Sequence, residues 1–281
     1  MMLGRRKLYV PTCKGRQVLK VIFACTLFLS LLFSAACERV VTPDEYFAIA
    51  QRVAAKIQRE ADERIRLEAA GEPEIKYSPE QLRNAEGDLE ALVDNLKRAS
   101  DGGHTLATYF LANLQDNPMF SERSRKETCG LYQKAMDQGL LAAAVGYYHL
   151  CDKAYERFDL HNADHLKYLQ SLEQLLKKPN VHGDAYPLPA KHSLCFFDEG
   201  APLPQQGALA AMRARAVALV LTEDQYRAEA NYILALTRVN RNDRHDSQNI
   251  ADLDEAEALG CNDFHGLSAM MRNAVKIAEK Q

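Results

Sequence analysis

Histidines and cysteines are the residues of this chain whose types and spacing are best suited to chemistry. His161 and His165 lie four positions apart in the stretch LHNADHLKY, a spacing that would put two imidazoles on one face of a helix, as in some zinc sites. A zinc site needs a third ligand, and the glutamate that accompanies such a pair in a metalloprotease helix is missing. We therefore interpret both histidines as surface residues near the start of a helix, and we predict no metal or other cofactor.

Other signatures of catalysis are also absent from the sequence. It contains no G-x-S-x-G turn for a serine nucleophile and no glycine-rich loop ending in Gly-Lys-Ser/Thr for a nucleotide phosphate. It contains no tryptophan, a residue that commonly stacks against sugars. Since nothing in the sequence forms a recognisable catalytic constellation, we predict that the protein is not an enzyme.

The N-terminal segment ends at a cysteine that can be modified. Six basic residues and no acidic residue precede Val21, an apolar run extends to Phe33, and three small residues lead into Cys37. This is the layout of a signal peptide, and the apolar run falls short of the roughly 20 residues that a spanning helix needs. A lipid-modified protein, a plain secreted protein and an uncleaved anchor are the three interpretations.

This stretch resembles the signal of a bacterial lipoprotein, in which lipid is attached to the cysteine before cleavage. Ser34 stands where that family usually has Leu, and Glu38 resembles the pattern that sorts lipoproteins to the outer membrane. The resemblance implies a signal peptide over residues 1–36 and a lipidated Cys37. It also implies a periplasmic protein anchored to the outer membrane, because two or three acyl chains suffice for stable attachment.

The charge of the mature chain limits the partners that suit it. The whole chain has 35 basic and 38 acidic residues, and loss of the six basic residues of the leader leaves a net charge of about −9. Such a chain is poorly suited to binding nucleic acid or anionic lipid through its surface. The acidity suits a basic protein partner, or it serves solubility alone.

Four further cysteines remain in the mature chain, and an even number favours disulfide bonds in an oxidising compartment. Cys129 lies ten residues before Gly139 and Cys151 lies twelve residues after it. Antiparallel helices joined at this glycine would bring the two cysteines opposite each other. The remaining pair is then Cys195 and Cys261, and four buried free thiols are the alternative.

An internal repeat indicates the architecture. The stretches ATYFLA (107–112) and ANYILA (230–235) share the pattern A-x-Y-x-L-A, and each is followed by an A-x-x-x-G stretch that ends at Gly139 or Gly260. The alanines allow close approach of a neighbouring helix, and the glycine is a common helix stop. Each unit is a helical hairpin that cannot bury its own apolar face, so several units are expected to stack into an α-solenoid.

These units resemble the Sel1-like repeats, which are related to the tetratricopeptide repeats. Residues 139–150 and 163–176 resemble a further unit of the same family. The resemblance implies an all-α fold with a solenoid of Sel1-like or TPR-like hairpins in residues 103–281, which follows an N-terminal helical region in residues 37–102.

Two longer helices are predicted ahead of the repeats. Thr42 with Glu45, and Ser78 with Gln81, match the capping-box pattern, and proline occupies the first helical position each time. The apolar stripe of the second helix predicts five buried side chains: Leu82, Ala85, Leu89, Leu92 and Leu96.

A proline-rich loop at residues 178–206 interrupts the repeats, and it holds five of the ten prolines of the chain. No helix can cross it, and a loop of this length inside a solenoid is usually functional or disordered. We predict that removal of residues 185–197 abolishes partner binding without unfolding the chain. The predicted partner-binding residues are Tyr186, Phe196 and Phe197 of this loop and Tyr147 and Tyr148 before it. Tyr147 and Tyr148, together with Tyr155 and Phe158, are either binding anchors on a concave solenoid face or core residues at helical spacing.

The family resemblance implies a protein that works by binding other proteins at the outer membrane. One implied function is immunity, in which the chain binds and neutralises a toxin of the type VI secretion system, such as a phospholipase, in the periplasm. The other implied function is a scaffold for envelope assembly, polysaccharide export or secretion machinery.

Overall fold

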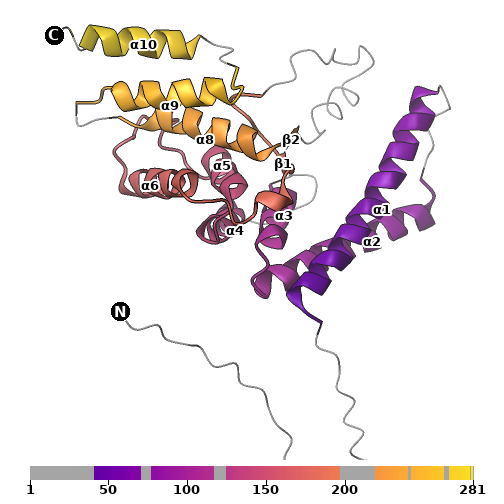
Figure 1. Ribbon diagram of the computed structural model, residues 1–281. Coiled ribbons are helices and arrows are strands. Elements are labelled where there is room, and N and C mark those ends of the chain that lie inside the picture. The colour runs from indigo at the N-terminus through magenta and orange to yellow at the C-terminus, as the bar shows by residue number, and fades with distance from the viewer. Residues whose placement is uncertain are drawn as a thin grey trace, which may run out of the picture. The chain divides into compact units, whose positions relative to one another are not determined.

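The computed structural model describes residues 41–70, 77–116, 125–196, 219–239, 242–262, 266–278 and 280. These residues are mostly helical, and helices that follow one another in the chain pack in pairs (Figure 1). The predicted signal peptide, the predicted lipidation site Cys37 and the predicted partner-binding residue Phe197 lie outside the described residues.

The helical segments of the described part are α1 (Pro43–Ala69), α2 (Pro79–Asp101), α3 (Thr105–Gln115), α4 (Arg125–Asp137), α5 (Leu141–Leu150), α6 (Ala163–Lys177), the single-turn η1 (Gly183–Ala185), α8 (Glu223–Thr237), α9 (Ser247–Ala258) and α10 (Leu267–Ala278).

The first two helices begin with the predicted capping boxes. The N–H of Thr42 donates to the Glu45 carboxylate at 2.9 Å, and the N–H of Glu45 donates to the Thr42 hydroxyl at 3.2 Å. Ser78 and Gln81 exchange the same two bonds at the start of α2. These bonds satisfy N–H groups that have no partner inside the helix, which explains why both helices start at these positions.

The contact between α1 and α2 buries only part of the predicted stripe. Phe47 of α1 packs with Leu92 and Leu96 of α2 in a cluster that buried residues of α3 extend. The prediction that Leu82 and Ala85 are buried is wrong, because residues 79–87 of α2 are all exposed and Leu82 has 53% of its surface exposed. No described side chain covers the first turns of α2.

The two predicted repeat units are the hairpins α3–α4 and α8–α9. Gly139 and Gly260 follow the second helix of each unit with φ angles of +97° and +91°, a conformation that glycine adopts most readily. The four alanines of the repeated pattern are fully buried, which confirms their role in close helix packing: Ala107, Ala112, Ala230 and Ala235.

Helix α5 lies at the centre of the largest core cluster. Its residues 141–145 are all buried, so it is apolar around its circumference, as a helix covered on all sides must be. It packs mainly on α4 and α8 rather than on α6, its expected hairpin partner. Helix α10 packs on α9.

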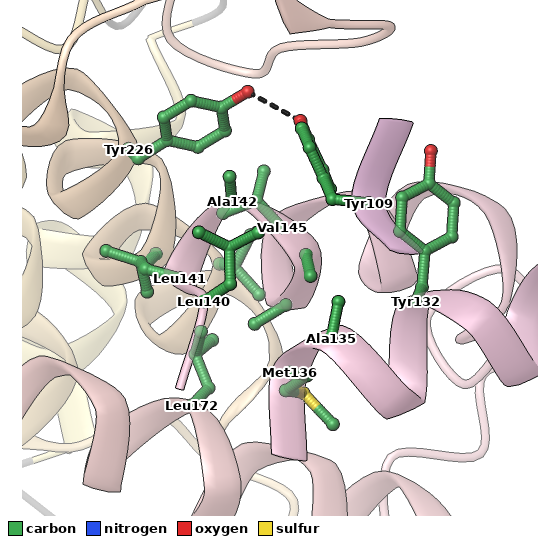
Figure 2. Close-up of a cluster of buried hydrophobic side chains, with 14 of the residues drawn as sticks. Tyr109, Tyr132, Ala135, Met136, Leu140, Leu141, Ala142, Val145, Leu172 and Tyr226 are labelled. Atoms are coloured by element: carbon green, nitrogen blue, oxygen red, sulfur yellow. Dashed lines mark hydrogen bonds between the residues drawn. The ribbon is translucent and has the colours of Figure 1, made fainter. Parts of the chain in front are cut away.

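Three tyrosines from three helices meet in this core. Figure 2 shows Tyr109 of α3, Tyr132 of α4 and Tyr226 of α8 close to the apolar side chains of α5. The hydroxyls of Tyr109 and Tyr226 lie 2.9 Å apart, and that of Tyr226 donates to the Pro189 carbonyl at 2.9 Å. Burial raises the pKa of Tyr109 to about 12, so its phenol stays protonated and joins α3 to α8, 117 positions away.

A short sheet departs from the predicted all-helical fold. Strand β1 (Leu188–Ala190) pairs antiparallel with β2 (Leu219–Leu221), and Leu188 lies opposite Leu221. The prolines at 187 and 189 prevent a helix here, since proline has no N–H to donate and clashes with the preceding helical turn. The extended segment instead pairs with the residues that precede α8.

Candidate binding surface

Both predicted disulfides are present in the structure. Cys129 of α4 is bonded to Cys151 at the end of α5, with Cα atoms 5.7 Å apart. Cys195 is bonded to Cys261, with Cα atoms 4.5 Å apart. The second bond holds residues 178–196, the described part of the proline-rich loop, which we call the stapled segment.

The stapled segment is part of the core rather than an appendage. Leu188, Ala190, Ser193 and Cys195 are all buried, and Leu188 and Ala190 belong to the main cluster. Removal of residues 185–197 would therefore expose core residues and break a disulfide bond. The prediction that this deletion leaves the fold intact is inconsistent with this packing, and we now expect the deletion to unfold the chain.

A buried carboxylate fixes the stapled segment to α8. Glu229 has no exposed surface, and it accepts hydrogen bonds from the Ser193 hydroxyl, from the Leu194 N–H at 3.0 Å and from the Cys195 N–H at 2.9 Å. Burial raises the pKa of Glu229, and these three donors partly oppose the rise because they favour the charged form. In a helix or a sheet, backbone carbonyls would accept from the N–H groups of Leu194 and Cys195. Here the carboxylate of Glu229 accepts from them instead.

His149 of α5 lies beside this carboxylate without being paired to it. Its Nε2 atom is 4.0 Å from Glu229 and has no hydrogen-bond partner among the described residues. Burial, with smaller contributions from His192 and Lys153, lowers the pKa of His149 to about 3, so the imidazole is neutral near pH 7 and the contact is not an ion pair. The adjoining cavity has a volume of about 10 Å³, which suits a single water molecule rather than a ligand.

The four described partner-binding candidates, Tyr147, Tyr148, Tyr186 and Phe196, are partly buried against the core. Tyr147 and Tyr148 stack on Tyr168 of α6, with ring centroids 5.5 and 6.4 Å away. The hydroxyl of Tyr186 accepts a hydrogen bond from the Ala142 N–H at 3.2 Å, and Phe196 packs on two core clusters. Of these residues, Tyr147 also lines a surface pocket. Their role in partner binding stays a prediction.

That pocket lies beside residues 151–162, which we call the α5–α6 loop. It has a volume of about 190 Å³ and a mostly polar lining. Cys151 anchors the loop to α4 through the disulfide, and the carboxylate of Asp152 lies 2.6 Å from Nδ1 of His165. The side chains of Asp152 and His165 are 6% and 1% exposed, so the base of the loop is held by a covalent bond and a buried polar pair.

The prediction of two surface histidines near a helix start holds for His161 and is wrong for His165, which is buried. Helix α6 begins at Ala163 with Asn162 as its N-cap, whose side chain accepts from the Asp164 N–H at 2.9 Å. His161 therefore precedes the helix, and it pairs with Asp243 on the surface. His165 is inside the helix and buried, because Asp152 and the Thr237 carbonyl provide partners for its ring.

The outer side of the α5–α6 loop carries two exposed aromatic side chains. Tyr155 is 46% exposed and Phe158 is 93% exposed. The sequence offered both residues as either binding anchors or core residues, and neither was among the five predicted partner-binding residues. Phe158 lies between Arg157 and Asp159 in the stretch ERFD, outside any helical apolar stripe, and this isolation is the signal that could have distinguished it.

A larger groove lies between α1 and α2. Its volume is about 910 Å³, and apolar side chains such as Ile57 and Leu89 alternate with charged ones along it. The salt bridge between Lys56 and Asp88, with 2.5 Å between the charged atoms, joins the two helices beside it. Nothing in the described residues occupies this groove.

Within the described ranges, no group of three or more histidine, cysteine or acidic side chains is placed to hold a metal ion. None of the described helices combines the length and apolar composition that crossing a bilayer requires. No protein-family model matches the chain, and no curated protein or solved structure is significantly similar to it.

Proposed function

We propose that the mature chain is a lipid-anchored periplasmic protein that works by binding a protein partner. The observation that carries this proposal is the construction of the α5–α6 loop. Its base is fixed by the Cys129–Cys151 disulfide and the buried Asp152–His165 pair, while its outer side presents aromatic and charged residues to solvent. Loops held on a rigid scaffold are common positions for binding residues.

The repeat geometry supports a Sel1-like α-solenoid as the architecture behind this function. The hairpins α3–α4 and α8–α9 share buried alanines in the first helix and a left-handed glycine after the second. We propose that these hairpins are units of one stacked array, whose side surfaces are available to a partner.

The two disulfides support an oxidising compartment such as the periplasm. Together with the proposed lipid on Cys37, they favour a protein confined near the outer membrane. Confinement raises the effective concentration against any protein that arrives at that surface, which suits an inhibitor of incoming toxins.

We propose immunity as the leading function, in which the chain neutralises a type VI secretion toxin such as a phospholipase by direct binding. The alternative is a scaffold lipoprotein for envelope assembly, polysaccharide export or secretion machinery. Both functions depend on protein binding, and neither requires a catalytic residue of this chain.

The test uses the mature chain, immobilised as the Cys37→Ser variant and exposed to periplasmic extract and to the secreted proteins of the source cell. Immunity predicts capture of a secreted toxin, and it predicts that cells lacking this chain die when that toxin reaches their periplasm. Capture of a component of envelope machinery, with no change in toxin sensitivity, would support the scaffold instead. If the chain captures no protein from either fraction, protein binding itself is excluded.

A further inference from the structure

Three helices of the described part end in the same hydrogen-bonded cap with glycine in the left-handed position. The N–H of Gly139 donates to the Met136 carbonyl at 2.9 Å, and the N–H of the next residue, Leu140, donates to the Ala135 carbonyl at 3.2 Å. This is the Schellman arrangement, and it recurs with Gly103 after α2 and with Gly260 after α9.

The α5–α6 loop contains the same cap with phenylalanine in place of glycine. The N–H of Phe158 donates to the Tyr155 carbonyl at 3.2 Å, and the N–H of Asp159 donates to the Ala154 carbonyl at 2.9 Å. The φ angle of Phe158 is +56°. A bulky side chain is strained in this region, whereas glycine adopts it without a steric penalty.

The side chain of Phe158 does not offset this strain by packing. It is 93% exposed, the highest value among the large apolar residues of the described part. In the cap after α4 the residue that follows the glycine, Leu140, is fully buried, whereas Asp159 follows Phe158 and is exposed. Phe158 therefore combines an unfavourable backbone conformation with an exposed ring, and folding alone does not explain its presence.

We propose that Phe158 is the anchor residue of the partner contact, and that its ring inserts into an apolar pocket on a protein. This inference rests on the proposed function and locates the contact on the α5–α6 loop, with Tyr155 beside it. A rigid aromatic side chain is a typical interface hot spot, because it buries a large apolar area at a small entropic cost. The disulfide and the Asp152–His165 pair below the loop hold the ring in position before binding.

The charges around Phe158 favour a protein pocket over a lipid surface. Glu156 and Asp159 lie within two positions of Phe158, and Asp164 lies in the first turn of α6; all three are exposed, and neither Asp159 nor Asp164 forms an ion pair with any described residue. Lys153 is paired with Glu156, which leaves Arg157 as the free cation of the loop. An anionic bilayer would repel this arrangement, whereas an apolar pocket in a protein accepts the ring and leaves the carboxylates in water.

The experiment compares Phe158→Gly, Phe158→Ala and Phe158→Tyr with the parent mature chain. The probe is the protein that the parent captures, purified and titrated by calorimetry. We expect the Gly and Ala variants to bind roughly 10-fold to 100-fold more weakly, because they lose the burial of one aromatic side chain. The Tyr variant should bind within about threefold of the parent. The matched control is Val181→Ala, which trims another exposed apolar residue, 74% exposed, and should leave the affinity unchanged.

Thermal unfolding of the same variants separates binding from folding. The melting temperature of Phe158→Gly should stay the same or rise by up to about 4 °C, since glycine relieves the strain at this position. A fall in both the Gly and the Ala variants would show that the ring supports the fold, and it would overturn the proposal.

The remaining outcomes also decide the matter. If the parent binds its partner and Phe158→Gly binds equally well, the anchor assignment is wrong and the proposed function stands. If the parent captures no protein, the anchor assignment and the proposed function are both rejected. If the parent floats with phosphatidylethanolamine–phosphatidylglycerol vesicles and Phe158→Gly does not, the ring is a membrane contact and the protein pocket is rejected.

Discussion

At the scale of single residues, the structure places two ionisable groups where the sequence shows only helix. Glu229 of α8 and His149 of α5 lie beside the stapled segment; Glu229 is fully buried, and the side chain of His149 is 12% exposed. One is a carboxylate with three donors, and the other is an imidazole whose Nε2 has no described partner. Because Glu229 has three hydrogen-bond donors and Nε2 of His149 has no described partner, replacing each residue should have a different effect on stability.

Two replacements of Glu229 should separate the contribution of its charge to the free energy of unfolding from the contribution of its hydrogen-bond acceptors. Glu229→Ala is expected to lower the free energy of unfolding by about 3 kcal/mol, because three buried donors lose their acceptor. Glu229→Gln should lower it by about 1 kcal/mol, since all three donors reach Oε1, which an amide also provides, and only the Leu194 N–H, which is shared with Oε2 at 3.0 Å, loses one acceptor. Urea unfolding followed by circular dichroism measures both values. Equal stability of the Ala and Gln variants would contradict this account of the carboxylate.

His149 should make the fold sensitive to acid. Its pKa is about 3 in the folded chain, below the 6.5 of a free histidine, so the unfolded chain binds the proton first as the pH falls. The stability that neutral His149 contributes is complete above about pH 6.5 and is lost between pH 6.5 and pH 3, by up to about 1.4 kcal/mol per pH unit.

The measurement is the urea midpoint of the parent and of His149→Gln between pH 7 and pH 4. The parent should lose more stability than the variant over this range, because glutamine does not titrate. Parallel curves would contradict the description of His149 as a buried neutral group, and the contributions of its titratable neighbours Glu229, Lys153 and His192 would then need to be reconsidered.

At the scale of elements, helix contacts depend on where the chain has small residues. Gly146 of α5 faces the ring of Tyr132, and a Cβ at this position would lie 2.5 Å from the nearest ring atom. Gly130 of α4 has nothing within 4 Å of the same hypothetical atom. Two glycines on adjacent helices therefore form a matched pair.

Substitution of each glycine by alanine should act in opposite directions. Gly146→Ala is expected to lower the free energy of unfolding by about 1–3 kcal/mol, because the buried Tyr132 ring must move. Gly130→Ala should raise it by up to about 1 kcal/mol, because alanine is the better helix former. Denaturant unfolding checks both signs, and a stabilised Gly146→Ala variant would show that α4 and α5 are packed less closely than described.

The two disulfides should differ in how much they stabilise the fold. Cys129–Cys151 spans 22 positions and Cys195–Cys261 spans 66. Replacing each pair by alanines should cost about 3 and about 4 kcal/mol respectively, because the longer loop restricts the unfolded chain more. Unfolding measurements on the two double variants give the comparison, and a larger loss for the shorter loop would mean that native packing, not chain entropy, controls the difference.

At the scale of the whole molecule, the proposed function depends on attachment of the chain to a membrane. We predict that the full-length parent incorporates labelled palmitate and sediments with the outer membrane, and that Cys37→Ser does neither, because it lacks the thiol that carries the lipid. The mature domain of the variant should fold normally, since Cys37 takes part in neither disulfide. Equal labelling of the two proteins would exclude the lipoprotein interpretation.

The sequence by itself determined where most helices begin and end, their capping boxes and the two hairpins α3–α4 and α8–α9, and it favoured the cysteine pairing that the structure shows. Capping and helix termination depend on residues within four positions of each other, as at Thr42 and Gly139, so they can be read from a short stretch. The cysteine pairing also followed from local geometry, because Cys129 and Cys151 flank one turn.

The tertiary structure alone decided which side chains are buried and which are left in solvent. His165 is buried because Asp152 and the Thr237 carbonyl, 13 and 72 positions away, meet its ring. Leu82 is exposed because it lies in the first turns of α2, outside the part of that helix that α1 and α3 bury, and Phe158 is exposed because it occupies a cap in a loop rather than a helix face. Burial depends on the neighbours that folding brings together from distant parts of the chain, and the local pattern of residue types does not contain that information.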